Sequence, residues 1–264
     1  MTPPDPFVAL MRRYVNDYTN RHDTTVCKDI MEPDYTLRMG PHVVAGLDDN
    51  YIPAAKKQFT QFPGLCLTVH EIVTNGARLA MRFSEHGAST RHGGAMACWQ
   101  GIGLYRWNGA KLVENMVEQD YESRRRQLAD RAPESLGTPA LAPWDTTAEP
   151  ADGAAEHVVR DWIAAGLPGR SVTVDDGDAT VLQEQATDTV DDLFSAGSAV
   201  AFRVSRTGRY CGGLAGVNPT LIGAASTLHL VGIVRVADRK VVSGHIIRDR
   251  LGLARALLSE DATA

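Results

Sequence analysis

The chain has 264 residues, of which 44% are hydrophobic and 22% are charged. This composition is typical of a globular protein with a substantial core, and it excludes a disordered, collagen-like or coiled-coil chain. The 27 Lys and Arg residues against 32 Asp and Glu residues give a net charge of −5. We therefore expect no nucleic-acid partner, because phosphate binding requires a basic surface.

The cysteines and the apolar runs bear on the cellular compartment. Cys27, Cys66, Cys98 and Cys211 are widely separated and form no CxxC pair, which argues against a disulfide framework or a zinc site. The N-terminus shows no secretory signal, and no run approaches the ~18 apolar residues of a membrane helix. The chain also lacks a phosphate-binding glycine loop and a serine nucleophile elbow. We predict a cytoplasmic protein with no membrane association, no metal and no cofactor.

The first half is predicted to contain helices followed by a sheet. Asp5 and Pro6 precede an apolar stripe at helical spacing that includes Tyr14 and Tyr18, which predicts a capped amphipathic helix. Alternating runs separated by short turns then predict antiparallel strands. The remaining expected elements are a short helix at Thr25–Met31, an extended piece at Asp34–Arg38, a helix at Asn50–Phe62, and strands at Leu65–Thr74, Arg78–His86, Met96–Trp107 and Lys111–Asp120.

The second half repeats part of this pattern. Residues 76–84 resemble residues 197–205 at an offset of 121, and Asp120 corresponds to Asp249 at an offset of 129. A helix around Trp162, with Asp152 as its cap, corresponds to the first helix, but about 27 residues that follow this helix in the first half have no counterpart. We predict a duplication that divides the chain into a first domain at 1–128, a Pro-rich linker at 129–153 and a truncated second domain at 154–264.

A family resemblance rests on segments of the first half, namely Gln61–Val69, Arg78–Arg82, Gly101–Trp107, Lys111–Glu114 and Asp120-Tyr121. They resemble the SnoaL-like polyketide cyclases of the nuclear transport factor two-like superfamily, which includes ketosteroid isomerase and limonene epoxide hydrolase. The resemblance implies an α+β fold. We expect two tandem cone-shaped curled antiparallel sheets packed with helices, the second truncated.

The resemblance also implies how the two halves are used. The sheets would pack through their outer faces, so that the second half is a pseudo-dimer partner within one chain, and further homo-oligomers are compatible with this arrangement. The ligand pocket is expected in the first half, for a small apolar molecule. The second half would then act as a scaffold.

The catalytic positions of the family are only partly kept. The position of the family's catalytic base corresponds to Met39, and the positions of its two acids on the last strands correspond to Gly103 and Val117. None of these three residues can exchange a proton. Tyr14 matches the tyrosine that stabilises an enolate in the ketosteroid isomerases, with a core tyrosine as the alternative. Asn115 has the alternation of an inward side chain and could bind a ligand or bridge to the first helix.

Two loop residues are candidates for the missing base. His42 and Asp34 are placed at the pocket mouth, where either could exchange a proton if its pKa were near neutrality, although a single loop histidine is often only exposed. The predicted catalytic set is therefore Tyr14, His42, Asp34 and Asn115.

The substrate-binding set is predicted to comprise Tyr18, Met39, Phe59, Arg82, Trp99 and Val117. Arg82 and Ser84 have the spacing of the Arg-x-Asp pair of limonene epoxide hydrolase, with Ser in place of the acid. Since Arg203 and Ser205 repeat this pair, a structural role is favoured. Strand alternation places Glu85 and His86 on opposite faces, so a metal site there is not expected.

Two functions remain open. The first is a cofactor-independent cyclase, isomerase or lyase acting on a small apolar cyclic metabolite, such as a polyketide, terpenoid, steroid or aromatic intermediate of antibiotic biosynthesis. The second is a non-catalytic small-molecule-binding or assembly module of the same fold, which the vacant positions Met39, Gly103 and Val117 favour.

Overall fold

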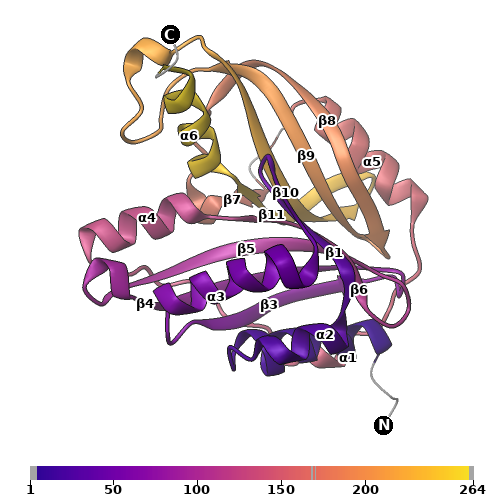
Figure 1. Ribbon diagram of the computed structural model, residues 1–264. Coiled ribbons are helices and arrows are strands. Elements are labelled where there is room, and N and C mark those ends of the chain that lie inside the picture. Colours follow the sequence, from indigo (N-terminus) through magenta and orange to yellow (C-terminus); the bar gives the residue numbers. More distant parts are fainter. Residues whose placement is uncertain (1–4, 168, 170, 262–264) are drawn as a thin grey trace.

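The computed structural model describes residues 5–167, 169 and 171–261. It consists of two stacked sheets, with most helices on their far sides and two helices together at one end of the stack (Figure 1). The first sheet has the strand order β2-β1-β6-β5-β4-β3. Its strands are β1 (Met31–Met39), β2 (His42–Ala45), β3 (Cys66–Thr74), β4 (Arg78–Ser89), β5 (Ala95–Trp107) and β6 (Leu112–Gln119). This α+β arrangement confirms the predicted fold class.

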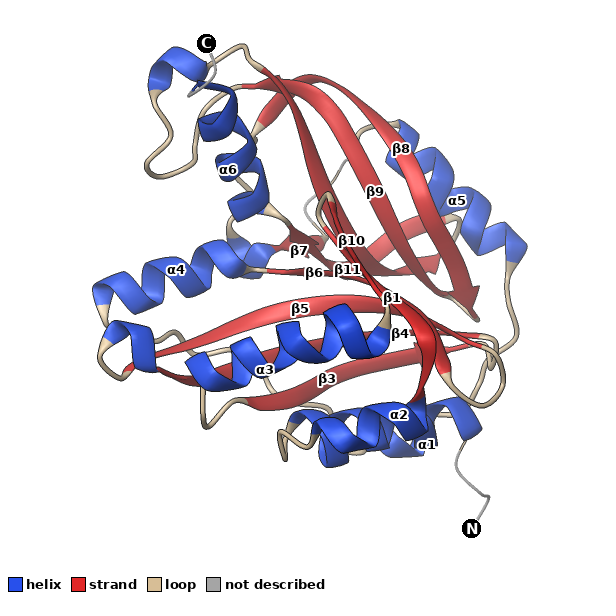
Figure 2. Ribbon diagram, in the orientation of Figure 1, coloured by secondary structure: helices blue, strands red, loops and turns tan. Residues whose placement is uncertain are grey.

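Helices cover the face of the first sheet that points away from the second sheet (Figure 2). Asp5 caps α1 (Pro6–Arg13) by accepting hydrogen bonds from the backbone N–H groups of Phe7 and Val8 at 2.9 and 3.2 Å, which satisfies two donors at the helix start. A π-helical turn, Tyr14–Thr19, continues α1. The other helices of this half are α2 (Cys27–Ile30), α3 (Ile52–Gln61) and α4 (Tyr121–Asp130).

The second sheet has the order β7-β11-β10-β9-β8. Its strands are β7 (Val172–Val174), β8 (Gln183–Ala196), β9 (Ala199–Tyr210), β10 (Ala225–Ala237) and β11 (Lys240–Arg248), and its helices are α5 (Gly153–Ala164) and α6 (Arg250–Asp261). Asp152 caps α5 as predicted, accepting from the N–H groups of Ala154 and Ala155. Helix α5 packs on the face that points away from the first sheet.

The two sheets correspond in register as well as in order. The irregularity between Val69 and Glu71 in the β3–β4 pair recurs between Val190 and Asp192 in the β8–β9 pair, 121 residues later. The irregularity after Arg106 in the β5–β6 pair recurs after Arg235 in the β10–β11 pair, 129 residues later. A bulge depends on specific local backbone geometry. Its recurrence at both offsets therefore shows that the two sheets share the same backbone register. Descent of the halves from one copied unit stays a prediction.

An apolar layer joins the sheets through their inner faces. Strands of both sheets contribute to one buried cluster, formed by Val73, Ala80, Ile102, Leu104, Met116, Phe194, Ala196, Ala199, Ala201, Val231, Ile233 and Ile247. Ion pairs border this layer: Asp192 contacts Arg78 and Arg106, and Arg235 donates to Glu71 at 2.6 Å. The face-to-face packing removes a large apolar area from water, and it leaves the opposite face of each sheet for the helices.

An ionisable carboxyl group lies within this interface. The Glu118 side chain is fully buried, and its carboxylate accepts from Gly40 N–H at 3.0 Å and from Arg203 Nη2 at 3.2 Å. Arg203 also donates to the Gly40 carbonyl at 2.8 Å and to Asp191 at 2.7 Å. Burial, assisted by the negative charge of Asp249, raises the pKa of Glu118 to about 8, although Arg203 and the Gly40 N–H act to lower it.

Some expected elements differ in the structure. Strand β1 pairs parallel to β6 rather than antiparallel, because a long connection that contains α3 and strands β2 to β5, and not a hairpin, joins the two. His42 lies in strand β2 and not in a loop. Helix α4 extends the first half to Asp130, and the linker that follows is bound to β3 through the hydrogen bonds of Ala140 N–H to Val69 and of Glu149 N–H to Thr74.

The buried Glu118 carboxyl predicts a pH-dependent stability. Its pKa is raised from 4.5 to about 8 in the folded chain, so the folded state holds a proton that the unfolded state releases near pH 4.5. Raising the pH from about 5 to about 8 therefore lowers the free energy of unfolding. In Glu118→Gln, the fall per pH unit should be smaller by up to about 1.4 kcal/mol, as measured by urea unfolding at each pH.

The control for this experiment is Glu184→Gln, which changes an exposed glutamate and should keep the native slope. An unchanged slope in Glu118→Gln would show that this carboxyl is ionised throughout the range.

Candidate functional site

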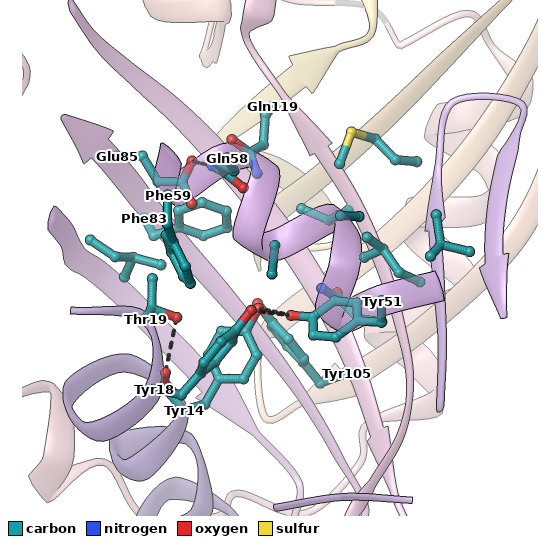
Figure 3. Close-up of a pocket in the computed structure, with 18 of the residues that line it drawn as sticks. Tyr14, Tyr18, Thr19, Tyr51, Gln58, Phe59, Phe83, Glu85, Tyr105 and Gln119 are labelled. Atoms are coloured by element: carbon teal, nitrogen blue, oxygen red, sulfur yellow. Dashed lines mark hydrogen bonds between the residues drawn. The ribbon is translucent and has the colours of Figure 1, made fainter. Parts of the chain in front are cut away.

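A cavity of about 250 Å³ lies between the first sheet and the helices that cover it. Residues from the first helix, from α3 and from strands β1, β4, β5 and β6 meet around it (Figure 3). Its wall is largely aromatic and aliphatic, with a few polar groups, which is typical of a site for a small molecule. The lining residues are Tyr14, Tyr18, Thr19, Leu37, Met39, Val44, Tyr51, Ala54, Ala55, Gln58, Phe59, Leu67, Phe83, Glu85, Tyr105, Asn115, Val117, Gln119 and Tyr121.

Three phenol groups meet on one side of the cavity. The Tyr18 hydroxyl donates to the Tyr51 hydroxyl at 3.2 Å, and the Tyr14 and Tyr51 hydroxyl oxygens lie 3.4 Å apart. Tyr14 and Tyr18 are four residues apart, so one face of the helical segment carries both. Burial raises the pKa of Tyr14 to about 12 and the pKa values of Tyr18 and Tyr51 well above 10. The three groups therefore stay protonated and act as hydrogen-bond donors.

A carboxyl group from β4 faces the same cavity. The Glu85 side chain is 5% exposed, and its Oε2 accepts from Gln58 Nε2 at 2.8 Å. Burial raises the pKa of Glu85 to about 7, although Arg124, Gln58 and Trp99 act to lower it. Arg124 is itself held over aromatic rings, with its guanidinium carbon 3.9 Å from the Tyr121 ring centroid. At neutral pH, Glu85 is populated in both protonation states and can accept or donate a proton.

Asn115 supplies an acceptor in the wall. Its side chain is 2% exposed, and its Oδ1 meets hydrogen-bond geometry with no group in the described part of the chain. The space it occupies exists because position 103 is glycine: a Cβ there would lie 2.9 Å from Asn115 Oδ1 and from the Tyr105 ring. The hydroxyls of Tyr35 and Tyr105 interact with the Asn115 side chain, and a ligand with a hydrogen-bond donor could use its Oδ1 as a further acceptor.

Six of the ten residues predicted for the site line the cavity, namely Tyr14, Tyr18, Met39, Phe59, Asn115 and Val117. The other four lie elsewhere. Asp34 and His42 are exposed on β1 and β2. Arg82 lies on the opposite face of the sheet and donates to Gln100 at 3.1 Å. Trp99 is fully buried outside the lining, where its indole N–H donates to Gln119 at 2.7 Å. The catalytic and binding roles of all ten residues stay predictions.

The sequence interpretation missed the carboxyl group. Glu85 and Phe83 are two residues apart on β4 and both line the cavity. Strand alternation alone places them on one face, so the signal was present beside an apolar neighbour. Tyr51 and Gln58 were also missed, since they come from the helical segment that includes α3, whose facing side requires knowledge of the sheet.

The described residues show neither a metal cluster nor a disulfide. Among them, no group of three or more His, Cys, Asp or Glu side chains is arranged to hold a metal ion. All four cysteines are free thiols. No helix in the ranges given above is long and apolar enough to cross a membrane.

Comparison with known proteins finds a family similarity in the first half of the chain. Residues 9–128 match the SnoaL-like polyketide cyclase family. The matched residues are the ones that surround the cavity, so this half of the chain is similar to the SnoaL-like polyketide cyclases. No curated protein matches the chain.

Solved structures resemble this same half at low sequence identity. A candidate SnoaL-like polyketide cyclase from Jannaschia sp. CCS1 is 16% identical with a TM-score of 0.45, and the match covers 49% of this chain and 95% of that chain. A candidate polyketide cyclase from Acidithiobacillus ferrooxidans is 16% identical with a TM-score of 0.44, covering 50% and 100%. IdmH, a candidate polyketide cyclase from Streptomyces antibioticus, is 18% identical with a TM-score of 0.41, covering 47% and 98%.

The environment of Glu85 predicts an unusual titration. Burial raises its pKa from 4.5 to about 7, so its side-chain carboxyl ¹³C shift should change with a midpoint near pH 7, whereas exposed glutamates titrate near pH 4 to 5. The measurement is an NMR pH titration of ¹³C-labelled protein, with the signal assigned through Glu85→Gln. A midpoint below pH 5 would contradict the proposed environment.

Proposed function

We propose that the chain is a cofactor-independent enzyme that uses its N-terminal cavity to cyclise or isomerise a small, largely apolar carbonyl compound. One observation carries the proposal: the Glu85 carboxyl, with a pKa of about 7, and the protonated phenols of Tyr14, Tyr18 and Tyr51 line one apolar cavity. A proton acceptor and hydrogen-bond donors are the groups that enolate chemistry requires. The match of residues 9–128 to the SnoaL-like polyketide cyclase family supports it.

The chemistry begins at a carbon next to a carbonyl group. The Glu85 carboxylate removes a proton from this carbon, and the electron pair of the C–H bond becomes an enolate. A phenol hydroxyl donates to the enolate oxygen and stabilises its negative charge. In a cyclisation, the enolate carbon bonds to a second carbonyl carbon of the same molecule, and the resulting alkoxide takes the proton from Glu85. In an isomerisation, Glu85 returns the proton to a different carbon.

The cavity wall indicates the kind of substrate. It offers apolar surface from Leu37, Leu67 and Phe83, hydroxyl donors from the tyrosines and an amide acceptor from Asn115. A folded polyketide, which alternates carbonyl and hydroxyl groups along a carbon skeleton, satisfies both kinds of polar group. Terpenoid, steroid and aromatic intermediates with a carbonyl group fit the same description. Enclosure would hold the reacting carbons close together, which itself accelerates ring closure.

A second function, ligand binding without turnover, is favoured by a specific observation. Met39 and Val117 stand at family catalytic positions and line the cavity, yet neither exchanges a proton. In a binding module, the cavity would hold its ligand unchanged, and Glu85 would serve only as a polar contact. Product formation separates the two functions.

Replacing Glu85 should remove the acid–base step. The measurement is the conversion of a panel of β-polycarbonyl thioesters and monocyclic ketones, followed by liquid chromatography and mass spectrometry. With a substrate that turns over, Glu85→Gln should lower kcat about 10²- to 10⁴-fold, and the inflection of kcat near pH 7 should disappear. Glu184→Gln, at an exposed position of the second half, is the matched control and should retain full activity.

The outcomes for Glu85 distinguish the alternatives. Full activity in Glu85→Gln would overturn its role as the base. Absence of turnover for the whole panel, together with a ligand-induced rise in Tm, would favour the binding module.

Removing one phenol donor should slow the reaction less than removing the carboxyl. Tyr14→Phe keeps the ring and deletes the hydroxyl, and a lost oxyanion donor costs roughly 10²- to 10³-fold in rate. Since Tyr18 and Tyr51 remain beside it, we expect a loss of about 10- to 100-fold in kcat with little change in KM. The same assay measures it, and an unchanged kcat would exclude Tyr14 as the donor to the enolate.

A further inference from the structure

The second half of the chain also encloses a cavity, which the sequence did not lead us to expect. It has a volume of about 220 Å³ and lies between the second sheet and α5. The apolar part of its wall includes Trp162, Val172, Val174, Leu228, Leu230 and Ile246. Its size is close to that of the first cavity.

The two cavities occupy the same place on their sheets. Ile246 of the second wall and Val117 of the first are related by the offset of 129, and Arg206 and Glu85 by the offset of 121. The strand pairing agrees, because Glu85 lies opposite Trp99 and Arg206 lies opposite Leu228. The second cavity is therefore the positional counterpart of the site described above, but an arginine stands where that site has its carboxyl group.

The charged groups in the second wall are already paired. Arg206 donates to both carboxylate oxygens of Asp188 at 2.7 Å. Arg248 donates to Asp175 at 2.7 Å and to the carbonyls of Thr180 and Asp178 at 2.6 and 2.7 Å. Each guanidinium of the wall thus contacts a carboxylate, although Arg248 shares Asp175 with Arg250. A charged ligand would lose its hydration without gaining an unpaired counter-ion. The wall favours a neutral ligand.

One buried atom in the wall lacks a partner. Gln183 is 7% exposed, and its Nε2 donates to the carbonyl and the hydroxyl of Ser226 at 2.9 and 2.8 Å. The Ser226 backbone carbonyl can only accept a hydrogen bond, so this contact fixes which end of the Gln183 amide is the nitrogen. Gln183 Oε1 is then left without a hydrogen bond among the residues that the structure describes. A buried acceptor without a donor is costly, and a small shift of the side chains around it would let a ligand hydroxyl supply the donor.

We propose that this cavity is a second ligand site, for a small neutral apolar molecule that carries a hydroxyl group. The apolar wall buries the body of the molecule, the paired arginines exclude a charged one, and Gln183 Oε1 accepts from its hydroxyl. Because the second cavity has no carboxyl at the position of Glu85, it would bind this molecule without the acid–base chemistry proposed for the first. The inference goes beyond the proposed function and does not depend on it.

The test uses 2-naphthol as the probe and isothermal titration calorimetry on the full chain. Ile246→Phe places a larger side chain in the second cavity, and Val117→Phe is the matched variant at the corresponding position of the first. We expect a binding event that Ile246→Phe removes and Val117→Phe retains. We also expect 2-naphthoate, which has the same rings and a negative charge, to bind at least 10-fold more weakly at this site.

A milder variant keeps the test valid if Ile246→Phe unfolds the chain. Gln183→Met removes the acceptor at similar side-chain volume, and it should weaken 2-naphthol binding about 10-fold while leaving 2-methylnaphthalene binding unchanged. The proposal is overturned by any of three results: no 2-naphthol binding that survives Val117→Phe, equal affinity for naphthol and naphthoate at the second site, or equal loss of both probes in Gln183→Met.

Discussion

The stacking of two sheets through one apolar layer is the constraint on which the rest of the structure depends. Small side chains such as Ala80 and Ala201 allow the strands of the two sheets to approach, and larger ones such as Ile102 fill the layer. Because this contact occupies one face of each sheet, the helices must cover the other face. Each half then has a curved sheet on one side and helices on the other, and an enclosed space forms where the side chains between them do not fill the interior.

Burial raises the pKa of two carboxyl groups that have different roles, one between the sheets and one at the cavity. Glu118 lies in the layer between the sheets, where the Gly40 N–H and Arg203 occupy its oxygens and join the halves. Glu85 lies at the cavity wall, where Gln58 holds one oxygen. Burial raises the pKa of both groups. The difference is access: only Glu85 can meet a ligand, so a proton exchanged there can be used for chemistry.

The sequence was informative where local pattern decides the structure. Alternation and turn residues located the central strands, the caps at Asp5 and Asp152 were correctly placed, and the offsets of 121 and 129 match the register of the sheets. Contacts between distant segments were not predictable in this way. The parallel pairing of β1 with β6 and the position of His42 on a strand depend on how the sheet curls. Arg82 lies on the opposite face of β4 from Phe83 and Glu85, as strand alternation requires. Alternation with Phe83 places Glu85 on the inner face of β4, but only the packing of α3 and α4 against that face shows that the carboxyl is buried.

The corresponding positions of Glu85 and Arg206 separate the roles of fold and side chain. Glu85 lies on β4 opposite Trp99 of β5, and Arg206 lies on β9 opposite Leu228 of β10. Each residue lines a cavity, and the two cavities are of similar size. In the first half, burial outweighs the nearby charge of Arg124 and leaves Glu85 with a pKa of about 7, so its carboxyl exchanges a proton at neutral pH. In the second half, Asp188 accepts two hydrogen bonds from the Arg206 guanidinium, and its negative charge compensates the positive charge of Arg206 at the cavity wall. The backbone thus sets where a molecule can be enclosed, and one side chain with its partner decides whether that molecule meets a proton acceptor or a neutral wall.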